Sequence, residues 1–223
     1  MPGAKVSAHS ARSADPAEPA RPAESGASRP PASSDERRGG RLVVLAGPSG
    51  VGKSSIVSAL RRHLPELYFS VSATTRDPRQ GEVDGRDYLF VGRAGFDQLV
   101  ERGELLEWAE IHGGLQRSGT PREPVEKALC AGRPVLVEVD LHGARAIKAA
   151  RPDVVTVFVE PPSFEELARR LRSRGTENPE QFERRLQSAR EELASRTEFD
   201  VALVNDDVEA VAVRLVELLV GRA

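Results

Sequence analysis

The chain has 223 residues, of which 39% are apolar, and its formal net charge at neutral pH is −2. This composition suits one sizeable α/β domain or two small ones, and the balanced charge predicts neither nucleic-acid nor membrane partners. Cys130 is the only cysteine, which excludes an intrachain disulfide and favours a reducing compartment, with the thiol packed in the core. The chain contains neither a membrane-helix run of roughly 18 apolar residues nor a signal-peptide core, which predicts a cytoplasmic protein.

Residues 1–40 differ in composition from the rest of the chain. They contain nine Ala, seven Ser and six Pro, and Val6 is their only branched aliphatic residue. Such a segment buries too little apolar surface to offset the entropy that ordering costs. The sequence therefore predicts a disordered N-terminal extension.

From Arg41 onward, short β-branched runs alternate with segments of helical character. The runs are almost continuously apolar, which is typical of a parallel sheet covered by helices on both faces. Ser163 and Glu166 form a capping box at the start of one helix. Strands are expected at 42–46, 135–140, 154–159 and 200–204, and helices at 53–63, 121–131, 141–150, 163–173, 179–195 and 207–220.

The pattern changes between residues 68 and 118. Short polar strands are expected at 68–72, 88–91 and 105–111, with a helix near 95–102. We interpret this segment as a small α+β insertion that carries an acceptor site beside the α/β core.

Residues 47–54 read Gly-Pro-Ser-Gly-Val-Gly-Lys-Ser between an expected strand and an expected helix. In this G-x-x-x-x-G-K-S motif, or P-loop, glycines let backbone N–H groups turn toward phosphates, and the helix adds its positive dipole end. The motif places Lys53 at the β and γ phosphates and the Ser54 hydroxyl on Mg²⁺. The residues predicted to bind ATP are Gly47, Pro48, Ser49, Gly50, Val51, Gly52, Lys53, Ser54 and Ser55.

Residues 72–88 fit the pattern S-x-T-T-R-x-P-R-x-G-E-x-x-G-x-x-Y at every fixed position. This segment resembles the GMP-binding segment of guanylate kinases, and the resemblance extends from Leu42 to about Leu219. It implies the P-loop nucleoside monophosphate kinase fold, with a parallel sheet core, an α+β GMP-binding insertion and a helical lid. The domain division that follows is a core of 41–67, 121–162 and 198–223, a GMP-binding subdomain of 68–120 and a lid of 163–197.

Two arginines of this segment suit a phosphate on physical grounds alone. Arg76 and Arg79 lie three apart in a polar loop, so their fork-shaped donor arrays can converge on one phosphate. The Tyr88 hydroxyl can add a further donor. Paired arginines in a polar loop are otherwise commonly solvated surface. By resemblance, Glu82 orients the arginines and the ribose.

Guanine presents its N1–H and N2 amino donors side by side, so one carboxylate can accept from both. By resemblance, Glu107 takes this role, Asp140 assists, Ser72 donates toward O6, and Thr120 aligns with a base-contacting hydroxyl. The alternatives are a surface carboxylate for Glu107, a turn hydroxyl for Ser72, and a helix N-cap for Asp140, which is compatible with contacting the base.

The stretch 112–120 departs from the commoner family pattern. It resembles the variant of actinobacterial members, and the loop 113–120 is one residue longer and lacks two tyrosines. This departure calls into question the tyrosine contact that the family makes from this loop to the GMP phosphate, and Ser118 or Arg117 can replace that tyrosine.

Seven arginines surround the helix-breaking stretch 175–179, which resembles a lid that closes over the triphosphate. Most of them pair with neighbouring glutamates on a solvated helical hairpin. By alignment with the family, we select Arg170, Arg174 and Arg185 as the arginines that face phosphate. The seven are Arg169, Arg170, Arg172, Arg174, Arg184, Arg185 and Arg190.

Two further polar residues follow core strands. Glu138 is expected to bind Mg²⁺ through water, and Asn205 either lies near the adenine of ATP or caps the following helix. The resemblance as a whole implies phosphorylation of GMP, and of dGMP, by ATP with Lys53, Arg76 and the lid arginines neutralising charge. The alternatives are a noncatalytic interaction domain of the same fold and a P-loop kinase for another acceptor. The sequence leaves a monomer and a homo-oligomer equally open.

Overall fold

The computed structural model describes residues 40–111, 115–173 and 179–221, except the side chains of Pro179 and Gln181. All of these residues belong to one unit, Arg37–Ala223. Gly40 is already held in it, because its N–H donates to the Leu129 carbonyl at 2.9 Å. The extension expected at residues 1–40 otherwise lies outside the described residues.

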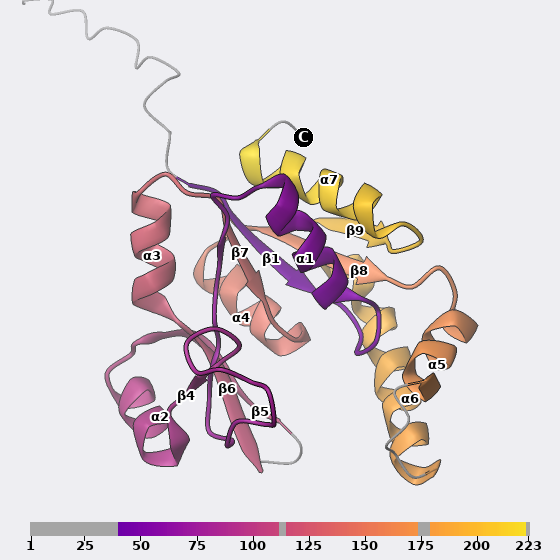
Figure 1. The fold of residues 1–223 in the computed structure, drawn as a ribbon, viewed down its shortest axis with the longest axis horizontal. Helices are drawn as coiled ribbons and strands as arrows, with labels where there is room; N and C mark the ends of the chain where they lie inside the picture. Colours follow the sequence, from indigo (N-terminus) through magenta and orange to yellow (C-terminus); the bar gives the residue numbers. More distant parts are fainter. Residues whose placement is uncertain (1–39, 112–114, 174–178, 222–223) are drawn as a thin grey trace, which may run out of the picture. The chain divides into compact units, whose positions relative to one another are not determined.

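A five-stranded parallel sheet forms the centre of this unit (Figure 1). Its central strand β1 pairs with β7 on one side and β8 on the other, and Leu42 lies beside Val135 in the first pair. This confirms the parallel α/β core that the apolar runs predict. In spatial order the strands are β2 (Tyr68–Phe69), β7 (Val135–Glu138), β1 (Leu42–Ala46), β8 (Val155–Glu160) and β9 (Val201–Val204).

The two faces of this sheet are buried against different helices. Side chains alternate between the faces of a strand, so Val43 and Leu45 pack into one apolar cluster and Val44 and Ala46 into another. Helices α1, α5, α6 and α7 supply the first cluster, while α3 and α4 supply the second. Burial on both faces explains why β1 has no polar residue.

Seven α-helices occur among the described residues, and most begin and end within one residue of the predicted bounds. Figure 1 shows α1 and α7 side by side on one face of the sheet. The first half of the predicted capping box is present, since the Glu166 N–H donates to the Ser163 hydroxyl at 3.1 Å. The helices are α1 (Lys53–His63), α2 (Gly92–Glu101), α3 (Arg122–Cys130), α4 (Leu141–Ala150), α5 (Phe164–Ser173), α6 (Pro179–Ala194) and α7 (Val208–Val220), and a 3₁₀ turn η1 spans Ser195–Glu198.

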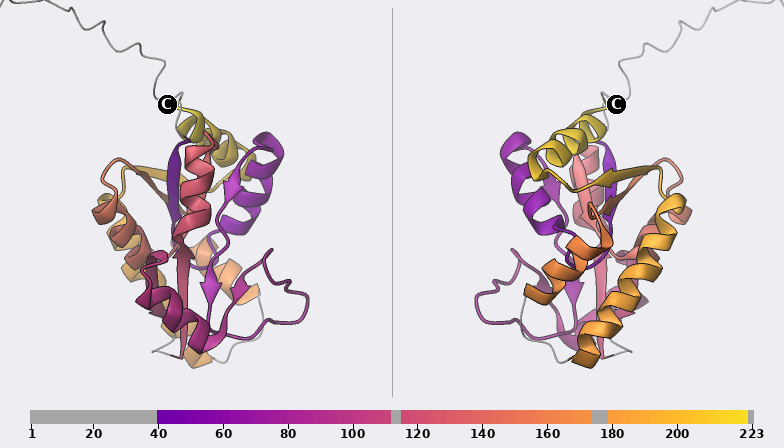
Figure 2. Two further views of the ribbon diagram at one scale, coloured as in Figure 1. Left: turned by 90° about the vertical axis from the view of Figure 1, so that its left-hand side faces the viewer. Right: turned by 90° about the vertical axis from the view of Figure 1, so that its right-hand side faces the viewer.

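A second, four-stranded sheet lies beyond one end of the first. Figure 2 shows this sheet and α2 on the side of the core opposite the C-terminal end of α7. Helices α5 and α6 extend toward the same side as the small sheet. The pairing of β3 with β4 is parallel, whereas β6 pairs antiparallel with both β3 and β5. In spatial order the strands are β4 (Leu89–Phe90), β3 (Ala73–Thr74), β6 (Gln116–Pro121) and β5 (Leu105–Ile111).

Three local expectations need correction. The single strand expected at 68–72 is instead two, because β2 joins the large sheet and β3 joins the small one. Residues 116–120, interpreted as part of a loop, belong to strand β6, whose backbone groups pair with β5. Cys130 is exposed rather than packed, because it is the last residue of α3 and Val125 and Ala128 fill the core position instead.

Within the described residues, no helix combines the length and the apolar character that crossing a membrane requires.

Candidate active site

The P-loop curls between β1 and α1 in a conformation that its glycines allow. Gly47, Gly50 and Gly52 have positive φ angles of 148°, 85° and 106°. Gly52 is the N-cap of α1, and a Cβ there would lie 2.5 Å from the Asn205 amide nitrogen. The Lys53 ammonium donates to the Gly47 carbonyl oxygen at 2.6 Å. The loop is therefore closely packed from behind, with the Lys53 ammonium held on its own backbone.

Three side chains from distant elements contact this loop. The buried Asn205 amide and the Arg170 guanidinium both donate to the Val51 carbonyl, at 2.7 and 3.1 Å. The Arg185 guanidinium donates to the Ser49 hydroxyl at 2.8 Å. Two of the predicted lid arginines are thus at the P-loop, while Arg174 lies outside the described residues.

Asn205 does not cap helix α7. That role belongs to Asp207, whose carboxylate accepts from the Glu209 N–H at 2.8 Å. The N-cap interpretation of Asn205 is therefore wrong, and its proximity to adenine stays a prediction. Its amide supports the loop from beneath instead.

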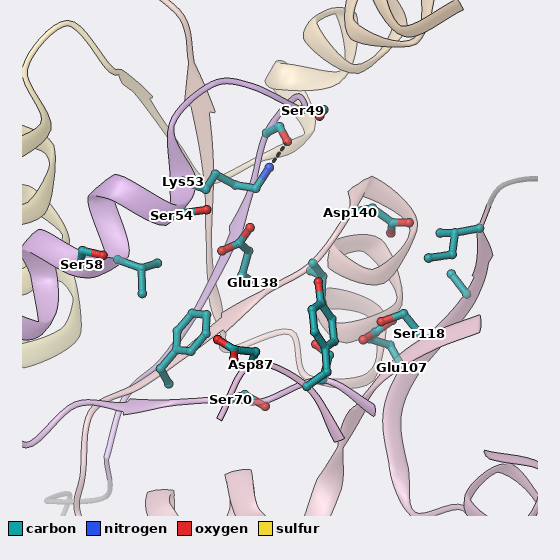
Figure 3. A pocket seen from close by; sticks show the side chains of 18 of the residues that line it. Ser49, Lys53, Ser54, Ser58, Ser70, Asp87, Glu107, Ser118, Glu138 and Asp140 are labelled. Atoms are coloured by element: carbon teal, nitrogen blue, oxygen red, sulfur yellow. Dashed lines mark hydrogen bonds between the residues drawn. The ribbon is translucent and has the colours of Figure 1, made fainter. Parts of the chain in front are cut away.

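A cleft of about 550 Å³ extends from the P-loop to the small sheet. Figure 3 shows Glu138 between Lys53 at one end and Glu107 at the other. The cleft joins residues that the sequence selects for both nucleotides, although they come from both sheets. The predicted residues that line it are Gly47, Ser49, Lys53, Ser54, Ser72, Tyr88, Glu107, Ser118, Glu138 and Asp140.

Glu107 is a buried carboxylate at the far end of the cleft. Its side chain extends from β5 and is 8% exposed, and one of its oxygens accepts from the Thr120 hydroxyl of β6 at 2.6 Å. Burial raises the pKa of Glu107, the Thr120 hydrogen bond lowers it, and the nearby Asp140 charge raises it again. The surface interpretation of Glu107 is therefore wrong.

Asp140 both caps α4 and lines the cleft. Its Oδ1 accepts from the Gly143 N–H at 2.8 Å, which confirms the N-cap expectation. The predicted strand 135–140 accordingly ends at Glu138, because Asp140 has turned to begin the helix.

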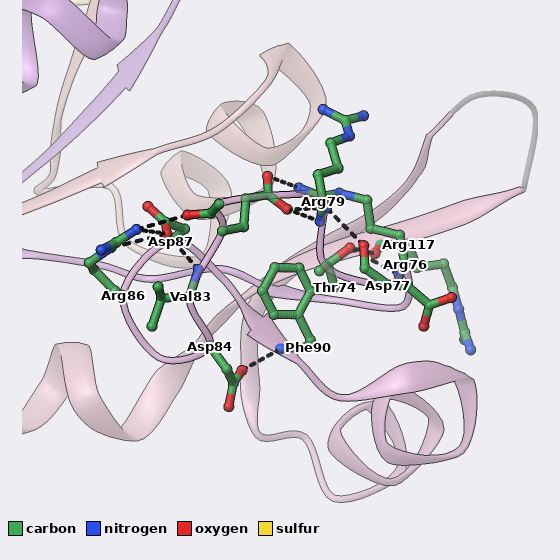
Figure 4. A network of polar contacts seen from close by, with 12 residues as sticks. Thr74, Arg76, Asp77, Arg79, Val83, Asp84, Arg86, Asp87, Phe90 and Arg117 are labelled. Atoms are coloured by element: carbon green, nitrogen blue, oxygen red, sulfur yellow. Dashed lines mark hydrogen bonds and ion pairs between the residues drawn. The ribbon is translucent and has the colours of Figure 1, made fainter.

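Arg76 forms an ion pair with Glu82 in the loop before β4. Figure 4 shows Arg76 and Arg79 in this loop. The two terminal nitrogens of the Arg76 guanidinium donate to the two Glu82 oxygens at 2.6 and 2.7 Å. The backbone N–H of Arg79 donates to the same carboxylate at 2.7 Å. These bonds lower the pKa of Glu82 to about 2. The Arg76 guanidinium also stacks over the Tyr88 ring, 4.7 Å from its centre.

Several predicted residues do not reach the cleft wall. Arg76 and Arg79 are absent from the cleft lining, so their convergence on one phosphate stays a prediction. Arg117 turns toward α2, where it pairs with Asp97 at 2.6 Å and stacks over Phe96. Of the two replacements considered for the missing tyrosine, only Ser118 faces the cleft.

Comparison with known proteins agrees with this geometry. A model of the guanylate kinase family matches residues 39–221. A guanylate kinase of Rhodococcus jostii is 63% identical over 185 residues, which cover 83% of this chain and 89% of that protein. The chain belongs to the guanylate kinase family. A guanylate kinase of Mycobacterium tuberculosis is 56% identical over 88% of this chain and 94% of its own length, in line with the actinobacterial variant of residues 112–120.

A solved structure supports the same assignment. The crystal structure of guanylate kinase from Anaplasma phagocytophilum superposes with a TM-score of 0.67 at 34% identity, and it covers 82% of this chain and 86% of that one.

The cleft of this guanylate kinase family member also contains residues that sequence reasoning missed. Glu192 is the most informative, because burial raises its pKa while the Lys53 ammonium lowers it. It lies seven residues after Arg185 on α6, so helical periodicity places both on one face. That spacing was the available signal. The other missed lining residues with polar or aromatic side chains are Ser58, Arg61, Phe69, Ser70, Arg86 and Asp87.

Proposed function

We propose that this protein is an ATP-dependent guanylate kinase, which transfers the γ-phosphoryl group of ATP to GMP, and to dGMP, and yields ADP and the corresponding diphosphate. The observation that carries the proposal is the continuity of one cleft from the P-loop to a buried carboxylate. Lys53 and Ser54 line one end, and Glu107 lines the other. A donor site and an acceptor site in one cleft permit direct transfer.

The acceptor end suits guanine. A carboxylate accepts from the N1–H and N2 amino groups of guanine, whereas adenine offers a lone pair at N1 that a carboxylate would repel. One Glu107 oxygen is held by Thr120, which fixes the orientation of the carboxylate. Ser72 and Asp140 line the same cleft and can contact the base edge.

The donor end supplies positive charge. Phosphoryl transfer requires reactants held in line and charge stabilised on the phosphoryl oxygens, with little covalent chemistry from the protein. Lys53 lines the cleft, and Arg170 and Arg185 contact the loop beside it. We propose that these groups, with Arg76, neutralise the transferring group. A general base is unnecessary, because the attacking phosphate oxygen of GMP is already anionic.

The residues present also fit Mg²⁺ held jointly with nucleotide. Mg²⁺ typically keeps several waters and takes one or two protein oxygens plus substrate phosphates. Ser54 and Glu138 offer such oxygens in the cleft, and the described part of the chain contains no cluster of three acidic, His or Cys residues that would hold the ion alone. Ser54 would bind the ion directly and Glu138 through water, and the bound ion would neutralise phosphate charge.

Substrate preference tests this function. ADP release should be measured with ATP and each of GMP, dGMP, AMP, CMP and UMP. We expect GMP and dGMP to be used at least about 10²-fold more efficiently than the others, since mismatched polar groups stay unpaired in a buried site. A folded protein without turnover would favour the noncatalytic interaction domain. Preference for another monophosphate would favour a different kinase.

A further inference from the structure

Gly143 occupies an unusual position for a glycine. It is the third residue of α4, and its backbone conformation does not need glycine, since its φ lies outside the left-handed region. In a helix, glycine is less favourable than alanine. Something other than backbone geometry must therefore favour the absence of a side chain here.

Two neighbours leave no room for a side chain at Gly143, namely the Glu107 carboxylate and Val139. A Cβ on Gly143 would lie 2.9 Å from Glu107 Oε2 and 3.1 Å from its Cδ, both closer than an ordinary van der Waals contact. The same Cβ would lie 2.9 Å from the Val139 Cβ. The other Glu107 oxygen, Oε1, accepts from Thr120 at 2.6 Å. The carboxylate is thus confined between a hydroxyl of β6 and the backbone of α4.

We propose that Gly143 is a specificity-determining positioning residue: its missing side chain lets Glu107 adopt the orientation that reads guanine. This inference rests on the proposed function. Gly143 does not contact the base itself, and it acts by leaving the space that the Glu107 carboxylate fills. Because the carboxylate is buried and held from both sides, a displacement of a few tenths of an ångström alters its hydrogen bonds to the base.

The discriminating measurement compares GMP with IMP, since hypoxanthine lacks only the N2 amino group. In Gly143→Ala the added methyl displaces the carboxylate, and we expect the preference for GMP over IMP in kcat/KM to fall about 10-fold or more. The KM for ATP should stay within about twofold. The control is Gly95→Ala on α2, a helical glycine outside the cleft lining whose added Cβ would lie 3.2 Å from Val91. An unchanged GMP/IMP ratio in Gly143→Ala would overturn the proposal.

A double-mutant cycle of melting temperatures keeps the test informative if Gly143→Ala is unstable. Melting temperatures of wild type, Gly143→Ala, Glu107→Asp and the double variant isolate the coupling between the two positions. Aspartate is one methylene shorter, so the alanine should lower the melting temperature less in that background. An equal loss in both backgrounds would assign the clash to Val139 and overturn the proposal. If wild type failed to phosphorylate GMP, the proposed function would fail, yet this cycle would still measure the contact.

Discussion

At the scale of single residues, the recognition of guanine that we propose depends on a carboxylate that is unfavourable to bury. Glu107 is 8% exposed, and its hydrogen bonds from Thr120 come from neutral donors, the hydroxyl and the backbone N–H. A buried carboxylate whose donors are neutral loses hydration energy that these donors do not fully replace. We expect a ligand with two adjacent donors to recover this energy when it enters the cleft.

Glu107→Gln tests that role with little change in size. The substitution replaces one acceptor oxygen with an amino group that faces the donors of guanine. We expect kcat/KM for GMP to fall about 10²-fold or more, because each unsatisfied buried group costs about 1–3 kcal/mol. The control is Glu110→Gln, at an exposed position of the same strand. Unchanged GMP kinetics in Glu107→Gln would reassign guanine recognition to Asp140.

The same substitution should alter the pH dependence of stability. Burial raises the pKa of Glu107 in the folded state above its unfolded value of about 4.3. Between the two values, the folded protein binds more protons than the unfolded one, so the free energy of unfolding falls as pH rises through that window. Glutamine does not titrate. The melting temperature of Glu107→Gln should therefore exceed that of wild type at pH 7 and approach it near pH 4.5. A difference that stays constant across this range would contradict the account.

At the scale of elements, helices α5 and α6 each bring an arginine to the P-loop. Neighbouring arginines on the same helices need not reach the loop. Arg185 contacts Ser49, whereas its neighbour Arg184 pairs with Glu180 in solvent. Arg185→Lys keeps the charge but loses the planar fork. We expect kcat to fall about 10-fold or more in Arg185→Lys and to change less than twofold in Arg184→Lys, as judged by steady-state assays with saturating GMP. Equal effects in the two variants would show that the helix contributes only general charge.

The elements also show what the sequence could predict. Strand β1 and its parallel neighbours are predictable from the sequence, because a strand buried on both faces consists almost entirely of apolar residues. Strand β6 lacks this composition: residues 116–121 are polar and contain glycine and proline. Its pairing with β5 and β3 makes it a strand, and such tertiary pairing overrides local propensity. A single sequence does not show this pairing.

The candidate site follows the same division. The P-loop and the segment 72–88 are recognisable from their local spacing, so the sequence alone singles out their residues, and the roles of those residues stay predictions. The contact of Thr120 with Glu107 and the proximity of Glu192 to Lys53 arise only from folding. Arg117 was a reasonable phosphate ligand on charge, but Asp97 and Phe96 give it a partner on α2 instead.

At the scale of the whole molecule, the cleft couples two sheets that differ in construction. The P-loop follows β1 of the parallel sheet, and Glu107 belongs to β5 of the small mixed sheet. Each sheet contributes one end of the cleft. We therefore expect each nucleotide to bind mainly to residues positioned by one of the two sheets. Their contributions to binding should therefore be separable, because energetic effects of distant sites add when they share no partners.

Thermal shifts in a crossed pair of variants test this separation. A ligand at 100 times its Kd stabilises the folded state by about 2.7 kcal/mol, which corresponds to about 5–10 °C for a chain of this size. Wild type should show such a shift with GMP and with ATP in Mg²⁺ buffer. Glu107→Gln should lose most of the GMP shift and keep the ATP shift. Lys53→Ala should do the reverse, and it should also lose nearly all turnover while remaining folded. If each variant lost both shifts, the two ends of the cleft would bind as one site, and the assignment of donor and acceptor to separate sheets would be wrong.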